Sequence, residues 1–137
     1  MKKRSQKGFT LSELLLASAI LVFVLAGLLL LFVKCLVLNE SNRNLSVALS
    51  HAQYIMENIR DADFAQLESD IGGGTWDLTA GQIQTTPHNL PVLNNETINT
   101  AVTQSGDPLG VEVLVRWDDR GQRQRSVDLE TLITTYR

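Results

Sequence analysis

The chain divides into a continuous apolar run near its N-terminus and a longer polar part in which apolar residues recur at regular spacing. No charged residue occurs in the twenty positions from Leu14 to Val33. A helix rises about 1.5 Å per residue, so a run of this length spans about 30 Å, the thickness of the hydrocarbon core of a bilayer. The pattern therefore predicts a transmembrane helix over Leu14 to Val33.

The helical period continues beyond this run. Apolar side chains recur every three or four residues and form one stripe: Leu45, Leu49, Ala52, Ile55 or Met56, and Ile59. This spacing is typical of an amphipathic helix that packs on a core. Because neither proline nor glycine occurs between Leu28 and Ile71, we expect one helix from about Thr10 to about Phe64. Its first half, 9–38, would lie in the membrane, and its second half, 39–65, would pack under a globular head.

The remaining part of the chain has the pattern of short strands. Gly72-Gly73-Gly74 predicts a break after the helix. Short strands are expected near Trp76–Thr79 and Thr97–Gln104, within a region rich in turn residues. The strongest β signal is the alternation in Val111–Trp117, which is followed by a second alternating run in Ser126–Tyr136. Turn residues lie between the two runs, so this region predicts a β-hairpin.

Together these elements predict an α+β fold: a long N-terminal helix, half transmembrane and half amphipathic, followed by a small antiparallel β-sheet head over 66–137. The polar part holds about a hundred residues, which is enough for one small core. The turn Asp118-Asp119-Arg120-Gly121 contains two adjacent acids. Such acids beside a glycine turn are usually loop residues, so we do not expect them to act as metal ligands or as a catalytic pair.

Charge is distributed unevenly along the chain. Lys2, Lys3, Arg4 and Lys7 precede the apolar run without any acid among them, which leaves eight Lys and Arg against 15 acids in the rest of the chain. Cationic flanks stay on the cytoplasmic side of a membrane, so the N-terminus is expected in the cytoplasm and the head outside it. The later arginines are interleaved with acids, so direct binding of nucleic acid is not predicted.

Few residue types suited to metal binding or covalent catalysis are present. Cys35 is the only cysteine, and His51 and His88 are the only histidines. An intramolecular disulfide is therefore impossible, and a metal site built on Cys and His is not expected. No arrangement typical of a nucleophile with its base, or of a zinc protease, occurs in the sequence. We predict a protein that is not an enzyme and needs no cofactor.

The apolar run differs from an ordinary signal peptide. Signal peptides have apolar regions of about 7–15 residues that end in small residues at a cut site. Here the run is longer and is followed by Lys34-Cys35-Leu36-Val37-Leu38. An uncleaved anchor fits the length of the run, but it explains neither Gly8 nor the carboxylate of Glu13 at the edge of an apolar segment.

Two interpretations of Glu13 are open from the residues alone. Thr10 and Glu13 have the spacing of a capping box, in which a threonine and a glutamate satisfy backbone donors at the start of a helix. Alternatively, a carboxylate beside a membrane-length run serves a purpose, because charges near hydrocarbon are costly and rare. The two roles are compatible.

The stretch K-G-F-T-L-S-E-L-L-L-A, residues 7–17, resembles the processing site of type IV prepilins and type II secretion pseudopilins. The resemblance implies that a prepilin peptidase removes the leader 1–8 by cutting between Gly8 and Phe9, and then methylates the new N-terminus of Phe9. The apolar segment would remain in the mature protein. The resemblance also implies a pilin-like fold with a long N-terminal helix and a small sheet.

The resemblance gives Glu13 a role in assembly. The amine of Phe9 that cleavage creates is largely cationic at neutral pH. In the resembling family, the glutamate at this position pairs with the N-terminus of a neighbouring subunit in a filament. Such an ion pair is strong where the dielectric constant is low. Glu13 and Phe9 are thus the expected assembly residues.

The resemblance favours a minor subunit. The phrase V-R-W-D-D-R-G, residues 115–121, looks like minor pilins of the PilV type. Many major pilins have a proline in the apolar helix and a disulfide loop near the C-terminus, and this chain lacks both. The calcium loop of the major pseudopilin is not recognisable either. We predict a minor type IV pilin-like structural subunit that initiates or joins a pilus. A minor pseudopilin of a type II secretion system is one alternative, and an anchored adhesin or DNA-uptake module is another.

The same resemblance implies where the protein acts and with what. Expected partners are other pilin or pseudopilin subunits, the prepilin peptidase, the assembly platform of the inner membrane, and membrane lipid. The expected location is the bacterial inner membrane, crossed once with the head in the periplasm, and then the pilus or pseudopilus filament.

Overall fold

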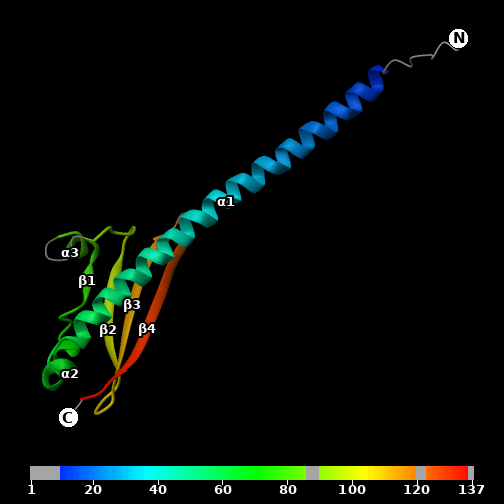
Figure 1. Ribbon diagram of the computed structural model, residues 1–137. Helices are drawn as coiled ribbons and strands as arrows, with labels where there is room; N and C mark the ends of the chain where they lie inside the picture. The colour runs from blue at the N-terminus through cyan, green and yellow to red at the C-terminus, as the bar shows by residue number, and fades with distance from the viewer. Residues whose placement is uncertain (1–9, 86–89, 120–122, 136–137) are drawn as a thin grey trace, which may run out of the picture. The chain divides into compact units, whose positions relative to one another are not determined.

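The computed structural model describes residues 10–85, 90–119 and 123–135 (Figure 1). The chain separates into two units, Met1–Asn39 and Glu40–Arg137. The first described element is the helix α1, Leu11–Arg60, which is 50 residues long and belongs to both units. From residue 10 to residue 39 every side chain is exposed. The buried residues of α1 all lie in its last turns, between Ala48 and Ile59.

The second unit contains a four-stranded antiparallel sheet and two short helices. The strands are β1 (Leu78–Thr79), β2 (Thr97–Gln104), β3 (Leu109–Asp119) and β4 (Arg123–Ile133), in the order β1-β2-β3-β4. The helices are α2 (Phe64–Gly72) and α3 (Ala80–Gln84). The α+β fold predicted from the sequence is confirmed, with a long apolar N-terminal helix and a small antiparallel sheet.

The predicted hairpin is formed by β3 and β4. Their register pairs Leu109 with Ile133 at one end and Asp119 with Arg123 at the other. The alternation in β3 buries Val111, Val113, Val115 and Trp117 completely. The turn residues 120–122 lie outside the described residues. The predicted strand at Thr97–Gln104 is confirmed as β2, and the one near Trp76–Thr79 is confirmed in the shorter form β1.

The core of the second unit lies between the last turns of α1 and one face of the sheet (Figure 1). It contains Ala48, Ala52, Ile55, Met56 and Ile59 from α1, Leu67 and Ile71 from α2, Ile83 from α3, and Ile98, Leu109, Val111, Val113, Val115 and Trp117 from the strands. The apolar stripe predicted from the sequence begins one turn too early. Leu45 is 46% exposed, Leu49 is only half-buried, and burial starts at Ala48.

The long helix ends earlier than the sequence predicts. It stops at Arg60, and a separate helix begins at Phe64 after the N-cap Asp63. The Asp63 carboxylate accepts a hydrogen bond from the Ala65 N–H at 3.1 Å. The aspartate side chain binds a backbone N–H that has no partner within the helix, and this starts a new helix although no glycine or proline is present. The sequence pattern did not predict α2 or α3.

The break predicted at the three glycines is confirmed. Helix α2 ends at Gly72, and Gly73 caps it by donating its N–H to the Ser69 carbonyl at 2.9 Å. Gly74 has a φ angle of 73°, a left-handed conformation that glycine adopts without steric cost. The chain therefore turns here from helix α2 toward the sheet.

Candidate functional site

The start of α1 is capped by Thr10. The Glu13 N–H donates to the Thr10 carbonyl at 3.1 Å and lies 3.4 Å from the Thr10 Oγ1. These contacts satisfy one of the backbone donors that a helix start leaves free. The cap places Glu13 in the first turn of α1, where the positive end of the helix dipole favours a carboxylate.

The side chain of Glu13 is exposed, and no cation pairs with it among the residues that the structure describes. A row of exposed apolar side chains follows, which includes Leu14, Leu15, Leu16 and, at 82% exposure, Phe23. Covering such side chains is favourable by roughly 1.5–3 kcal/mol each. This surface therefore requires lipid or the apolar surface of another protein.

Helix α1 is long and apolar enough at its N-terminal end to cross a membrane. The predicted span Leu14–Val33 lies wholly within α1, and its side chains are exposed throughout. Gly8 and Phe9, the predicted cleavage and methylation residues, lie outside the described residues. The structure thus describes only Glu13 and the apolar segment among the residues predicted to act in processing and assembly.

Residues 3–29 match the family model described as "Prokaryotic N-terminal methylation motif". The chain carries a prokaryotic N-terminal methylation motif. The motif indicates a type IV pilin-like or pseudopilin-like protein, and the apolar helix behind it could anchor the chain in a membrane. Proteins with this motif are structural, assemble with other pilins, and are processed by prepilin peptidase. No curated protein and no solved structure matches the chain.

The match includes Gly8, Phe9 and Glu13. It ends at Leu29, so it does not extend to the second unit of the chain. The motif therefore carries no information on the function of the second unit.

Asp118 and Asp119, which the sequence places in a turn, lie at the end of β3. Asp119 accepts hydrogen bonds from the Ser41 hydroxyl at 3.0 Å and the Asn44 amide at 3.4 Å. Arg125 lies 2.9 Å from the same carboxylate. These contacts join the hairpin to α1. In the described part of the chain, no group of three or more His, Cys, Asp or Glu side chains is placed to hold a metal ion.

Sequence reasoning missed the buried pair of His51 and Glu96. The His51 Nδ1 lies 2.6 Å from the Glu96 Oε1, and the two residues are 2% and 1% exposed. The other oxygen, Glu96 Oε2, accepts the Leu93 N–H at 2.8 Å. Buried charges are usually paired, so a histidine among the buried positions of α1 was the available signal that a partner exists elsewhere. Its partner, 45 residues away, could not be chosen from the sequence.

Proposed function

We propose that this protein is a minor type IV pilin-like subunit that prepilin peptidase cuts between Gly8 and Phe9 and methylates at Phe9. Mature subunits are held in the bacterial inner membrane by Leu14 to Val33, with the N-terminus cytoplasmic and the head periplasmic. They then initiate or join a pilus. The observation that carries the proposal is the carboxylate of Glu13, exposed in the first turn of an uncovered apolar helix within a methylation motif.

The chemistry of assembly follows from charge in an apolar environment. The Phe9 amine is largely cationic once it is free. A subunit that slides along the apolar helices of its neighbours is held where this cation meets the Glu13 carboxylate of another subunit. The pair is much stronger there than at a surface, because water does not screen it. Removing either charge leaves the other uncompensated.

A minor role is supported by the sequence rather than by the head's geometry. The apolar run contains no proline, and Cys35 is the only cysteine, so the chain departs in both respects from many major pilins.

Intact mass spectrometry of the protein from membranes tests the first step. In cells with prepilin peptidase we expect the mass to fall by that of residues 1–8 and to rise by about 14 Da for one methyl group. In cells without the peptidase we expect the full-length mass. A full-length mass in both strains would contradict the proposal and leave Glu13 as a helix cap on an ordinary anchor.

The matched control is Lys7→Ala, which keeps the glycine, and the test variant is Gly8→Val. We expect Lys7→Ala to be cut and methylated, and Gly8→Val to keep its leader, because a β-branched side chain occupies the space next to the scissile bond. Equal processing of both variants would place the cut elsewhere.

A further inference from the structure

Strand β4 is a long open edge of the sheet. The strand order leaves β1, with two residues, and β4, with 11, at the two edges. Within the described residues no strand pairs with the far side of β4. An edge strand presents unpaired backbone N–H and C=O groups, which proteins usually protect with charged side chains, proline or a bulge. β4 contains no proline, and its register with β3 is continuous. Its charged side chains are Arg123 and Arg125 at one end and the two acids Asp128 and Glu130 in the middle.

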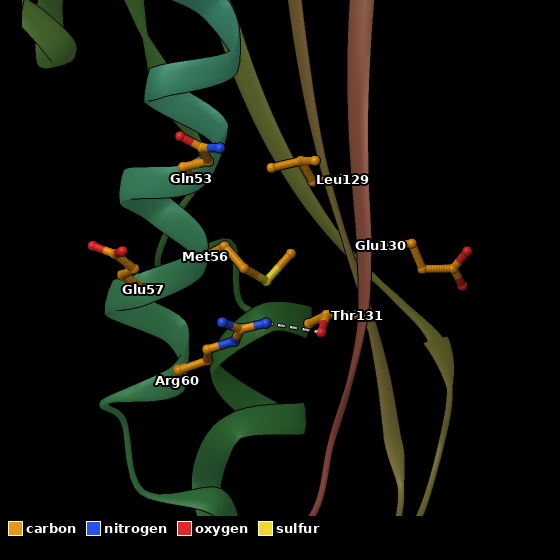
Figure 2. Close-up of a pocket in the computed structure, with 7 residues that line it drawn as sticks. All are labelled: Gln53, Met56, Glu57, Arg60, Leu129, Glu130 and Thr131. Atoms are coloured by element: carbon orange, nitrogen blue, oxygen red, sulfur yellow. Dashed lines mark hydrogen bonds between the residues drawn. The ribbon is translucent and has the colours of Figure 1, made fainter.

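A groove runs beside this edge, between α1 and β4. It has a volume of about 380 Å³ and is lined by Gln53, Met56, Glu57, Arg60, Leu129, Glu130 and Thr131. Figure 2 shows the side chain of Met56 extending from α1 toward β4, and Leu129 lying on the helix side of the strand. Arg60 donates to the Thr131 hydroxyl at 3.1 Å. The groove therefore offers two apolar side chains, Met56 and Leu129, among polar ones.

The side of β4 that faces the groove is incompletely covered. Val127, Leu129 and Ile133 pack against the core but remain half-buried, whereas Val111, Val113 and Val115 of β3 are fully buried. Another strand placed beside β4 would cover these side chains with its own, because neighbouring strands present side chains to the same face at matching positions. The added strand therefore needs apolar residues at the positions that face Val127, Leu129 and Ile133.

The opposite side of β4 is acidic. Asp128 and Glu130 are exposed there, and Figure 2 shows Glu130 projecting away from the groove. Glu130 lies directly opposite Glu112 of β3. Like charges in this position repel and destabilise a sheet. The Thr103 hydroxyl donates to Glu130 at 2.8 Å, but it is neutral. Arg116 is on the same face and lies opposite Ser126. It is therefore further from Glu130 than Asp128 is.

We propose that β4 and the groove bind an extended segment of a partner polypeptide in which apolar residues alternate with lysine or arginine. The segment adds a fifth strand to the sheet through the free backbone groups of β4. Its apolar side chains cover Leu129 and Met56. Its cations lie against Asp128 and Glu130 and relieve the repulsion between Glu112 and Glu130.

This surface belongs entirely to the second unit, Glu40–Arg137. It uses neither Glu13 nor the N-terminus of Phe9. Binding at β4 is therefore independent of processing and filament entry, and a failed mass experiment would leave this proposal intact.

The test uses the full-length protein in detergent micelles and a ten-residue peptide in which valine and threonine alternate with lysine. We expect NMR shifts confined to β4 and to Gln53–Arg60, and slower amide exchange along β4 in the complex. A peptide with glutamate in place of lysine should bind at least tenfold more weakly. The double variant Asp128→Lys, Glu130→Lys should reverse this preference, since it reverses the charges that select the peptide.

Glu68→Lys is the matched control, because Glu68 is an exposed acid on α2, away from β4. It should bind the lysine peptide within twofold of the unchanged protein. If the double variant unfolds, Asp128→Asn with Glu130→Gln removes the charges at constant size, and it should also lose the preference for lysine. Three results would overturn the proposal: equal binding of both peptides, shifts without slower exchange in β4, or self-association through β4 that excludes the lysine peptide.

Discussion

At the scale of single residues, the contact between His51 and Glu96 joins segments that are far apart in the sequence. His51 is on α1, and Glu96 directly precedes β2. Both side chains are buried, and the carboxylate is bonded at both oxygens, to the imidazole and to the Leu93 N–H. A half-satisfied buried polar group is costly, so this pair specifies how the loop before β2 lies on the helix.

Replacing Glu96 with alanine should destabilise the head strongly. Removing the carboxylate leaves two buried groups, the His51 imidazole and the Leu93 N–H, without their hydrogen-bond partner, and each unsatisfied group costs about 1–3 kcal/mol in free energy of unfolding. Urea unfolding in detergent micelles, followed by tryptophan fluorescence, measures this loss. Glu96→Gln should cost less, because an amide of the same size can still bond to both neighbours. Equal losses in the two variants would show that the carboxylate itself is required and that an amide of the same size cannot replace it. His51→Ala combined with Glu96→Ala should be less than additive.

At the scale of elements, Asp63 determines that the chain forms two helices rather than one. The residues between Arg60 and Phe64 contain no glycine or proline. The Asp63 carboxylate nevertheless caps α2, and α2 then buries Leu67 and Ile71 in the core. The change of direction thus depends on a local hydrogen bond and on the apolar positions that follow it.

Replacing Asp63 with alanine should loosen α2. Losing a side-chain N-cap costs about 1 kcal/mol, so we expect a loss of that size in the free energy of unfolding and faster amide exchange over Phe64–Gly72. Gln66→Ala is the control, since Gln66 is exposed in the same helix. It should change stability little, because alanine is a good helix former. A loss in Gln66→Ala as large as in Asp63→Ala would contradict the role of the cap.

At the scale of the whole molecule, the chain combines an uncovered apolar helix with a packed head. The core residues all lie in Glu40–Arg137, while every side chain from residue 10 to residue 39 is exposed. The head therefore obtains its stability from its own core. The apolar segment obtains its cover from lipid or from other molecules, and Glu13 lies at the N-terminal end of that segment.

Glu13→Gln separates the two roles proposed for Glu13, helix capping and charge pairing. Glutamine still suits the third position of a capping box but carries no charge. We expect the variant to be cut, methylated and inserted, yet to enter filaments at least tenfold less than the unchanged protein, as immunoblots of sheared filaments against membranes would show.

Thr10→Ala is the opposite control. It removes the hydroxyl that caps α1 and keeps the carboxylate. We expect it to enter filaments nearly as well as the unchanged protein. If Thr10→Ala fails while Glu13→Gln assembles, capping rather than charge pairing is the function of this pair of residues.

Sequence patterns predicted the elements in which one spacing of apolar residues is repeated over neighbouring positions. The transmembrane-length helix is indicated by an uninterrupted apolar run and a stripe at helical spacing, and the β3–β4 hairpin by two alternating segments. In each of these elements, burial or exposure follows the regular geometry of the backbone, so the sequence repeats it. The motif around Gly8, Phe9 and Glu13 is also local, and a match to residues 3–29 supports it. These features need no knowledge of distant contacts.

Only the tertiary structure decided which positions are joined across the chain. It shows that Leu45 is exposed, that Asp63 begins a second helix, that His51 meets Glu96 and that Asp119 is bonded to Ser41 and Asn44. It also shows that β4 is left as an open edge beside a groove. Each of these depends on packing between segments that are distant in sequence, and local pattern contains no information on which distant partner a side chain meets.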